Sequence, residues 1–308
     1  MVKDALIGLA VGDALGVPVE FKSRDTLRSS PVTDMIGFGT HQQPAGTWSD
    51  DSSLAFCLAE CLIEGYTPQK LGDFFVKWLF NAHWTPHGQV FDVGMATSQS
   101  IRRIKEGCPP EIAGGMDEQD NGNGSLMRIL PLVFYILEKP IEERFRLTKE
   151  VSSITHAHIR SVIACFYYLE FARLLIKGHS RESAYKELKK TVMEYLQSIE
   201  IEAGETGLFH RLLVDDIASI EEGKIYSSGY VLHTLEASIW CLLTTNSYSE
   251  AVLRSVNLGS DTDTTGAVTG GLAGILYGYD SIPKEWVSKL ARLDDVLKLA
   301  DNLSKSPT

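Results

Sequence analysis

Two short acidic segments hold the residues best suited to chemistry in this sequence. Residues 46–53 read GTWSDDSS and residues 259–266 read GSDTDTTG, so each places two carboxylates and neighbouring hydroxyls beside glycine. Oxygen ligands with no thiolate or imidazole nearby are typical of Mg²⁺, Mn²⁺ or Ca²⁺ sites, and not of Zn²⁺ or copper sites. If the fold brings the segments together, four carboxylates meet, and their repulsion in a poorly hydrated site requires cations. Two divalent ions would nearly balance that charge.

The same residue types are also typical of helix N-caps. Ser, Thr and Asp side chains accept hydrogen bonds from the free N–H groups of a first helical turn, and negative charge there suits the helix dipole. Both segments precede apolar helical stretches, so capping and metal binding are compatible. A two-metal phosphoesterase is a further alternative. Such enzymes often use His ligands as well, and this ligand set is nearly free of His.

Composition excludes several classes of partner. The 308 residues include 29 basic and 40 acidic ones, for a net charge of −11, which argues against a nucleic acid or an anionic membrane as partner. Asp4 and Asp13 interrupt the apolar N-terminus, which therefore predicts neither a signal peptide nor a membrane span. The cysteines are odd in number and scattered, which favours free thiols in a reducing cytoplasm over a disulfide framework. They are Cys57, Cys61, Cys108, Cys165 and Cys241.

Apolar residues recur mainly at three- and four-residue spacing, which predicts amphipathic helices. Strand-like alternation is almost absent, so we predict an all-α fold. No Pro/Gly/Ser-rich linker divides the chain, so we predict a single domain over residues 1–308. Helices are expected at 71–79 and 166–175, and near 52–64, 89–106, 125–138, 141–152, 180–198, 229–244, 248–257, 265–277 and 284–304.

Two of the predicted helices carry glycines in steps of four residues. One helix has Gly8, Gly12 and Gly16, and the other has Gly270, Gly274 and Gly278. Four-residue steps place each set on one helical face, where the missing side chains let another backbone approach closely. Because such glycines lower helix stability, we interpret them as packing surfaces. They are not a dinucleotide-binding motif, which needs a preceding strand and different spacing.

Residues 120–128, which read DNGNGSLMR, predict a turn that leads into an apolar helix. Alternating glycines can turn successive N–H groups toward an anion, and the following helix end adds positive potential. An ordinary Asn-Gly turn is the alternative. We expect no metal role for His156 or His158, because the oxygen-rich segments already provide ligands. Glu20 and Asp92 are not distinctive on their own, and Asp92 has the alternative role of capping the helix that follows.

Five motifs occur along the chain in an order that resembles one family. They are residues 12–16 (GDALG) with Glu20, residues 46–51 (GTWSDD), residues 121–128 (NGNGSLMR), Thr155 with His156, and residues 259–264 (GSDTDT). This sequence resembles the ADP-ribosylglycohydrolases, which include the dinitrogenase reductase-activating glycohydrolases. The resemblance spans residues 5–280, and the two acidic motifs in this order are highly specific.

The resemblance implies a single all-helical domain with two Mg²⁺ or Mn²⁺ ions that removes ADP-ribose from modified groups. It implies that the metal ligands are Ser49, Asp50, Asp51, Asp261, Asp263 and Thr264. It further implies substrate contacts by Asn123, Gly124 and Ser125 at the diphosphate and by His156 at the ADP-ribose. Glu20 is implied to lie over the metals, near the scissile bond.

The sequence departs from the family pattern at two places. Ser49 replaces a more common Thr, which keeps the hydroxyl. Asp92 matches an Asp of the arginine-directed bacterial enzymes, but Met95 stands where those enzymes often have Asn. Met95 therefore weakens the assignment of the linkage that is cleaved.

The expected reaction gives these residues distinct roles. Hydrolysis at the anomeric carbon of the distal ribose passes through an oxocarbenium-like transition state and needs a held water and an assisted leaving group. Asp51 could accept the proton of the water, with Glu20 or Asp92 placed for acid or gating work. Anionic ADP-ribose is an awkward ligand for a chain of charge −11. We expect the metals, the loop at 122–125 and Arg128 to offset that charge locally.

We therefore predict a metal-dependent hydrolase that releases ADP-ribose from a protein or small-molecule substrate, with ADP-ribosyl-arginine preferred. The alternatives are a hydrolase of O-linked adducts on serine or of O-acetyl-ADP-ribose, and an inactive relative that only binds ADP-ribose. All four motif carboxylates are present, which argues against the inactive relative. The motifs do not separate the possible linkages.

Overall fold

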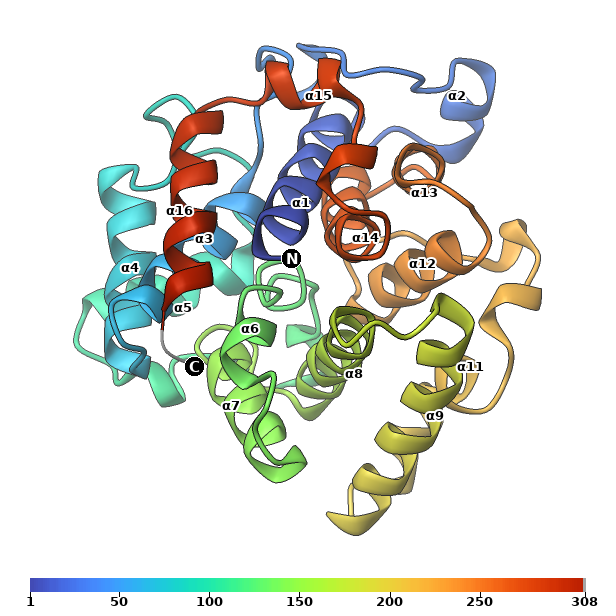
Figure 1. Cartoon of the computed structure of the whole chain (residues 1–308). Helices are drawn as coiled ribbons and strands as arrows, with labels where there is room; N and C mark the ends of the chain where they lie inside the picture. The colour runs from blue at the N-terminus through green and yellow to red at the C-terminus, as the bar shows by residue number, and fades with distance from the viewer. Residues whose placement is uncertain (307–308) are drawn as a thin grey trace.

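The computed structural model describes residues 1–306, which contain helices and three isolated β-bridges but no strand (Figure 1). The predicted all-α fold is confirmed. Within the described residues, no helix has both the length and the apolar character needed to cross a membrane.

The α-helices are connected by turns, irregular loops and short 3₁₀ helices, of which η1 (Val17–Val19) and η2 (Gly39–His41) border the site. The α-helices are α1 (Val2–Gly16), α2 (Arg24–Ser29), α3 (Asp50–Ile63), α4 (Pro68–Asn81), α5 (Met95–Lys105), α6 (Leu132–Ile136), α7 (Ile141–Ser153), α8 (Ile159–Ile176), α9 (Arg181–Ser198), α10 (Ala203–Leu208), α11 (His210–Leu213), α12 (Val231–Leu243), α13 (Tyr248–Val256), α14 (Thr262–Tyr277), α15 (Lys284–Lys289) and α16 (Leu293–Lys305).

Three predicted helices are shorter or broken in the structure. The helix expected at 89–106 begins only at Met95, because Asp92 has a left-handed φ of 52° that a helix does not accommodate. The one expected at 284–304 divides into α15 and α16 around Arg292, whose φ is 50°. The one expected at 125–138 is helical only in α6, and turns precede it up to Pro131, which lacks an N–H and restricts the residue before it.

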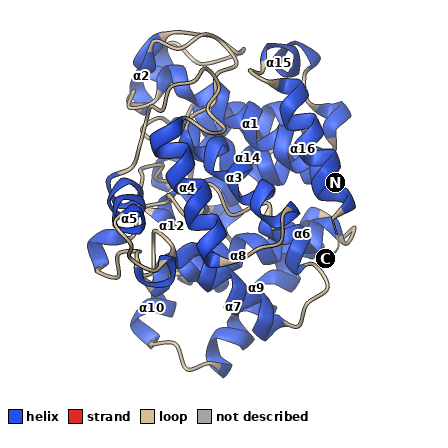
Figure 2. Ribbon diagram, turned by 90° about the vertical axis from the view of Figure 1, so that its left-hand side faces the viewer, coloured by secondary structure: helices blue, strands red, loops and turns tan. Residues whose placement is uncertain are grey.

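Helices α1 and α14 lie side by side at the centre of the molecule and are almost entirely buried (Figures 1 and 2). Helices α3 and α16 pack near α1, and α12 and α13 pack against α14. A helix that is apolar on all sides is expected in such a position. The centre of the fold is therefore built from two helices that lie at opposite ends of the sequence.

The contact between α1 and α14 is made by backbone atoms. A Cβ on Gly8 would lie 2.4 Å from the carbonyl oxygen of Gly270, and a Cβ on Gly12 would lie 2.1 Å from that of Gly266. The predicted close approach is confirmed, with one correction. The contact face of α14 is formed by Gly266, Gly270 and Gly274, whereas Gly278 caps the helix with a φ of 82° and has open space around it.

We expect Gly270→Ala to destabilise the protein by about 1–3 kcal/mol, because its methyl group would overlap the backbone of α1 and separate the helices. Gly207→Ala in α10 is the matched control. Nothing lies within 4 Å of its added Cβ, so the higher helix propensity of Ala should leave stability unchanged or raise it. Urea unfolding of both variants measures the difference, and equal stabilities would contradict the close contact.

Candidate active site

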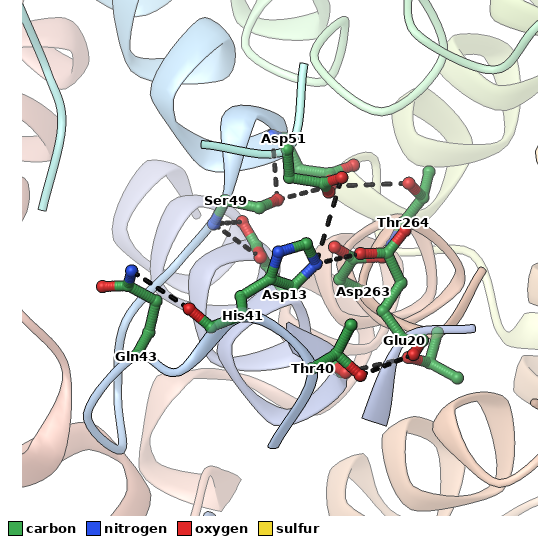
Figure 3. A network of polar contacts seen from close by, with 12 residues as sticks. Asp13, Glu20, Thr40, His41, Gln43, Ser49, Asp51, Asp263 and Thr264 are labelled. Carbon is green, nitrogen blue, oxygen red and sulfur yellow. Dashed lines mark hydrogen bonds and ion pairs between the residues drawn. The ribbon is translucent and has the colours of Figure 1, made fainter. Parts of the chain in front are cut away.

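The structure brings the two acidic segments together beneath one cavity. Carboxylate oxygens of Asp13, Asp51 and Asp263 all lie within 4.8 Å of one another, and all three residues are fully buried (Figure 3). They come from α1, α3 and α14, so three helices contribute one carboxylate each. The central helix pair therefore positions two of the three.

Asp13 was not among the predicted site residues. Its carboxylate accepts hydrogen bonds from the backbone N–H of Ser49 at 2.9 Å, the N–H of Ser52 at 3.0 Å and the Ser52 hydroxyl at 2.6 Å. Burial raises the pKa of Asp13 to about 7, although these hydrogen bonds oppose the rise. Asp13 thus fixes the start of α3 from a neighbouring helix. Its place in the buried stretch of an apolar helix is the sequence signal that could have identified it.

The two interpretations of residues 46–53, helix capping and metal binding, meet at Ser49. Its hydroxyl caps α3 by accepting the N–H of Asp51 at 3.2 Å, and it donates to Asp51 Oδ2 at 2.7 Å. The other oxygen, Oδ1 of Asp51, is buried without a hydrogen-bond partner. The cap therefore orients a carboxylate whose second oxygen is free for a ligand.

The second segment does not cap its helix through a side chain. Gly259 and Ser260 have φ values of 79° and 64°, and the resulting turn leads into Asp261, which makes no side-chain cap hydrogen bond. Asp261 Oδ2 instead accepts from Asn123 Nδ2 at 2.8 Å. Asp263 Oδ1 accepts from the N–H of Thr264 at 2.9 Å, and its Oδ2 is buried without a partner.

These carboxylates are costly to ionise in the protein alone. Burial, followed by repulsion from neighbouring carboxylates, raises the pKa of Asp50, Asp51 and Asp263 well above the ordinary value. The pKa of Asp261 is raised by burial as well. Two buried carboxylate oxygens without partners, surrounded by further oxygen donors, fit a hard divalent cation.

A second cluster lies beside the first and includes a residue that the sequence analysis missed. His41, at the end of η2, pairs through Nε2 with Glu20 Oε2 and lies 4.0 Å from Asp92 Oδ1. The centroid of its ring lies 6.1 Å from that of Phe21 and 5.2 Å from that of Phe91. The set of ligating groups near Asp263 is therefore not free of His.

No local pattern in the sequence indicated His41. The loop that carries it lies against η1, because Gly39, with a φ of 65°, approaches the carbonyl of Pro18 so closely that a Cβ would lie 1.9 Å from it. The hydrogen bond that protonated His41 donates to the Glu20 carboxylate raises the pKa of His41. Burial raises the pKa of Glu20 to about 7, opposed by its bond with His41. Glu20 can thus gain or lose a proton near neutral pH.

Asp92 is partly exposed on the approach to this cluster. The N-cap of α5 is Gly94, which has no side-chain capping bond, so the alternative that Asp92 caps this helix is wrong. Asp92 instead faces His41, held in a left-handed conformation that costs about 1–3 kcal/mol in a non-glycine residue. Such strain is common at functional sites.

A cavity of about 490 Å³ opens above both clusters. Of the predicted site residues, it is lined by Glu20, Asp50, Asp92, Asn123, Gly124, His156, Asp261 and Thr264. Ser49, Asp51 and Asp263 are buried and do not line it, and neither does Ser125. The Ser125 hydroxyl bonds with Ser152 Oγ at 2.9 Å and lies 3.4 Å from Cys165 Sγ, so it is engaged in the interior.

The 121–125 loop forms one wall of this cavity. The N–H of Asn123 donates to the carbonyl of Gly229, whereas the N–H groups of Gly124 and Ser125 donate to no acceptor among residues 1–306. A Cβ on Gly124 would lie 2.7 Å from His156 Cε1. Burial, with Arg128 nearby, lowers the pKa of His156 to about 3, so this ring is neutral. The free N–H of Gly124, which lines the cavity, supports an anion-binding role over that of a plain turn.

Two further residues named in the sequence analysis do not line the cavity. Arg128 is fully buried behind the loop and does not line the cavity, so it offers no exposed charge to a ligand. His158 caps α8 by accepting the N–H of Arg160 at 3.2 Å. This hydrogen bond gives His158 a structural role at the start of α8.

A divalent metal ion should stabilise this protein more at high pH than at low pH. The pKa values of Asp13 and Glu20 are raised to about 7, and burial and repulsion raise those of Asp51 and Asp263 as well, so the folded state binds more protons than the unfolded state. Stability of the metal-free protein then falls as pH rises through these pKa values. A cation relieves the same repulsion, and protons compete with it.

Thermal unfolding with EDTA or with Mg²⁺ or Mn²⁺ measures this effect at about pH 5.5 and about pH 8. Subtracting the Tm without metal from the Tm with metal at each pH removes the contribution of the other titrating groups. We expect a larger rise in Tm at the higher pH, and almost none in Asp263→Asn. An equal rise at both pH values, or in the variant, would contradict cation binding at these carboxylates.

Comparison with known proteins identifies the family. The sequence model of the family described as ADP-ribosylglycohydrolase matches residues 1–308. The chain is 33% identical over 307 residues to the ADP-ribosylarginine hydrolase Tri1 of Serratia proteamaculans (strain 568), covering 98% of this chain and 78% of that one. It is 30% identical over 292 residues to the ADP-ribosyl-[dinitrogen reductase] glycohydrolase of Rhodospirillum rubrum, covering 93% and 88%.

The fold leads to the same family. A solved structure described as an ADP-ribosylglycohydrolase-related protein complex matches with a TM-score of 0.81 and 31% identity, over 98% of this chain and 96% of that one. The match therefore includes the central helices and the segments that carry the buried carboxylates. This chain belongs to the ADP-ribosylglycohydrolase family, as its motifs predicted, and is a hydrolase of ADP-ribosylated substrates.

Proposed function

We propose that this enzyme cleaves the glycosidic bond at the distal ribose and releases ADP-ribose, with ADP-ribosyl-arginine as its preferred substrate. The observation that carries the proposal is the cavity whose floor lies over the buried carboxylates and whose wall is the 121–125 loop. Two relatives at 30% identity or more are named for arginine or dinitrogen reductase adducts, which supports the same chemistry.

The metal centre is proposed to hold two Mg²⁺ or Mn²⁺ ions. The proposed ligands are Ser49, Asp50, Asp51, Asp261, Asp263 and Thr264, among which Asp51 and Asp263 have oxygens without partners. Asp13 has a different role, because both its oxygens already accept hydrogen bonds from α3. When bound, such ions make a water more acidic and neutralise the surrounding carboxylates.

The chain's own residues then divide the work of hydrolysis. Asp51, which is also a proposed metal ligand, is proposed to accept the proton of the attacking water. Glu20 has a pKa of about 7 and a partner in His41, so it can hold a proton near the scissile bond and release it there. The proposed substrate contacts are Asn123, the backbone at Gly124 and Ser125, and the neutral ring of His156.

Acidic groups at the mouth favour an arginine adduct. A guanidine leaves readily only as its protonated cation, and a carboxylate such as Asp92 would stabilise that cation or deliver the proton. Serine-linked ADP-ribose and O-acetyl-ADP-ribose offer no such cation, so they are the second candidates. Met95 is largely exposed on α5 and lines the same cavity, so it lies where it could influence this choice.

We also propose that residues 1–308 form one domain. Support comes from the central pair, since α1 lies near the start of the chain and α14 near its end. The proposed metal centre then depends on both ends of the chain folding together.

A turnover panel with purified protein tests the proposed function. We expect release of ADP-ribose from ADP-ribosyl-arginine with Mg²⁺ or Mn²⁺, none with EDTA, and no recovery with Zn²⁺. Serine-linked ADP-ribose and O-acetyl-ADP-ribose should turn over more slowly. Full activity in a metal-free preparation would refute the metal centre, and faster turnover of an O-linked substrate would refute the arginine preference.

Asp92→Asn should lower hydrolysis of ADP-ribosyl-arginine by more than about tenfold, given that general acid–base groups contribute roughly a hundredfold or more. The effect on O-acetyl-ADP-ribose should be smaller, because its leaving group carries no positive charge. Asp280→Asn, an exposed carboxylate in the turn after α14, is the matched control and should behave as wild type. Equal losses on both substrates would argue against a contact between Asp92 and the leaving group.

A further inference from the structure

Arg128 is a buried cation for which residues 1–306 provide no carboxylate within ion-pair distance. Its Nη1 donates to the carbonyl oxygen of Gly124 at 2.5 Å and its Nη2 to that of Val151 at 3.1 Å, while Nε has no partner. The guanidinium lies 4.9 Å from the centre of the Phe75 ring. Burial lowers its pKa to about 10, so it remains charged at neutral pH.

This arrangement is expensive for a purely structural residue. A buried charge without a counter-ion loses hydration that two neutral carbonyls and an aromatic ring only partly replace. Asp50 lies near enough to favour the cation electrostatically but makes no ion pair with it, so the protein balances the charge at Arg128 only in part.

The cavity in front of Arg128 lacks positive charge. Its lining includes the acidic residues Glu20, Asp50, Asp92 and Asp261 but no Lys or Arg, and its one imidazole, His156, is neutral. The diphosphate of ADP-ribose carries negative charge into this space. Gly124 lines the cavity and also accepts the hydrogen bond from Arg128, so a single peptide group separates the cation from the cavity.

The same hydrogen bond orients the loop. A trans peptide places the Gly124 carbonyl and the Ser125 N–H on opposite sides, so the N–H points away from Arg128. That N–H has no acceptor among the described residues. A charge-assisted bond at the carbonyl polarises the peptide and makes its N–H a stronger donor.

We propose that Arg128 is a positioning residue for the substrate diphosphate, acting from behind the 121–125 loop. It supplies the positive potential that the acidic cavity lacks and fixes the peptide between Gly124 and Ser125 at the cavity wall. The inference rests on the proposed function, since it takes ADP-ribose as the ligand.

Calorimetric titration of ADP-ribose into the full chain with Mg²⁺ tests this role. Arg128→Met removes the charge at similar volume, and Arg128→Lys keeps the charge and one donor for the Gly124 carbonyl. We expect the Kd to rise about tenfold or more in Arg128→Met, since low-dielectric surroundings strengthen the lost attraction, and by less than about threefold in Arg128→Lys. The matched control is Arg254→Met, which removes a guanidinium bonded to the Thr244 carbonyl and stacked on Trp240, and should bind as wild type.

Thermal unfolding without ligand separates positioning from a structural role. If Arg128→Met is too unstable to titrate, Arg128→Lys decides the question. A tenfold loss of ADP-ribose affinity in an Arg128→Lys protein of wild-type stability would show that the positive charge does not account for binding. That result would overturn the proposal. Wild-type affinity in Arg128→Met would overturn it as well. Failure of the wild-type protein to bind ADP-ribose would refute the proposed function and this inference together, whereas wild-type affinity in Arg128→Met refutes the inference alone.

Discussion

The site depends on how closely the backbones of α1 and α14 approach each other. Glycines on both helices leave no room for a Cβ, and at the end of the contact a Cβ on Gly16 would lie 2.3 Å from the Cα of Asp263. The carboxylates of Asp13 and Asp263 converge because the helices that carry them touch. A side chain at this interface would move them apart, so the glycines position the site without contacting any ligand.

The charged groups around the cavity lie at different depths in the protein. Carboxylates gather beneath the cavity, where burial and mutual repulsion raise their pKa values, and a neutral His156 lies at the wall. Behind the wall lies the buried cation of Arg128. The buried carboxylates and the buried guanidinium are each unfavourable by themselves, because a low-dielectric interior disfavours an isolated charge. Cations bound at the carboxylates and an anion bound at the loop would neutralise these charges. A ligand with both a sugar and a diphosphate could therefore fit the site.

Rigid and irregular segments contribute different parts of the site. The proposed metal ligands lie at the starts of α3 and α14, where helix geometry limits their movement. Glu20, His41 and Asp92 lie at the end of a 3₁₀ helix or in a loop, and φ is 52° at Asp92 and 64° at Phe21, the residue after Glu20. The residues proposed to exchange protons or meet the leaving group therefore lie on irregular segments, whereas the proposed metal ligands lie on helices.

The sequence by itself determined the helical class, most helix positions, two glycine faces suited to close packing and the two acidic segments. These features depend on local periodicity and on residue types within a few positions of each other. The tertiary structure decided what distant segments do to one another. It paired Asp13 with the start of α3, placed His41 against Glu20, and buried Arg128 behind the loop. It also turned the Ser125 hydroxyl into the interior. The physical reason is that burial and hydrogen-bond partners are set by packing between segments far apart in the chain, which local spacing does not encode.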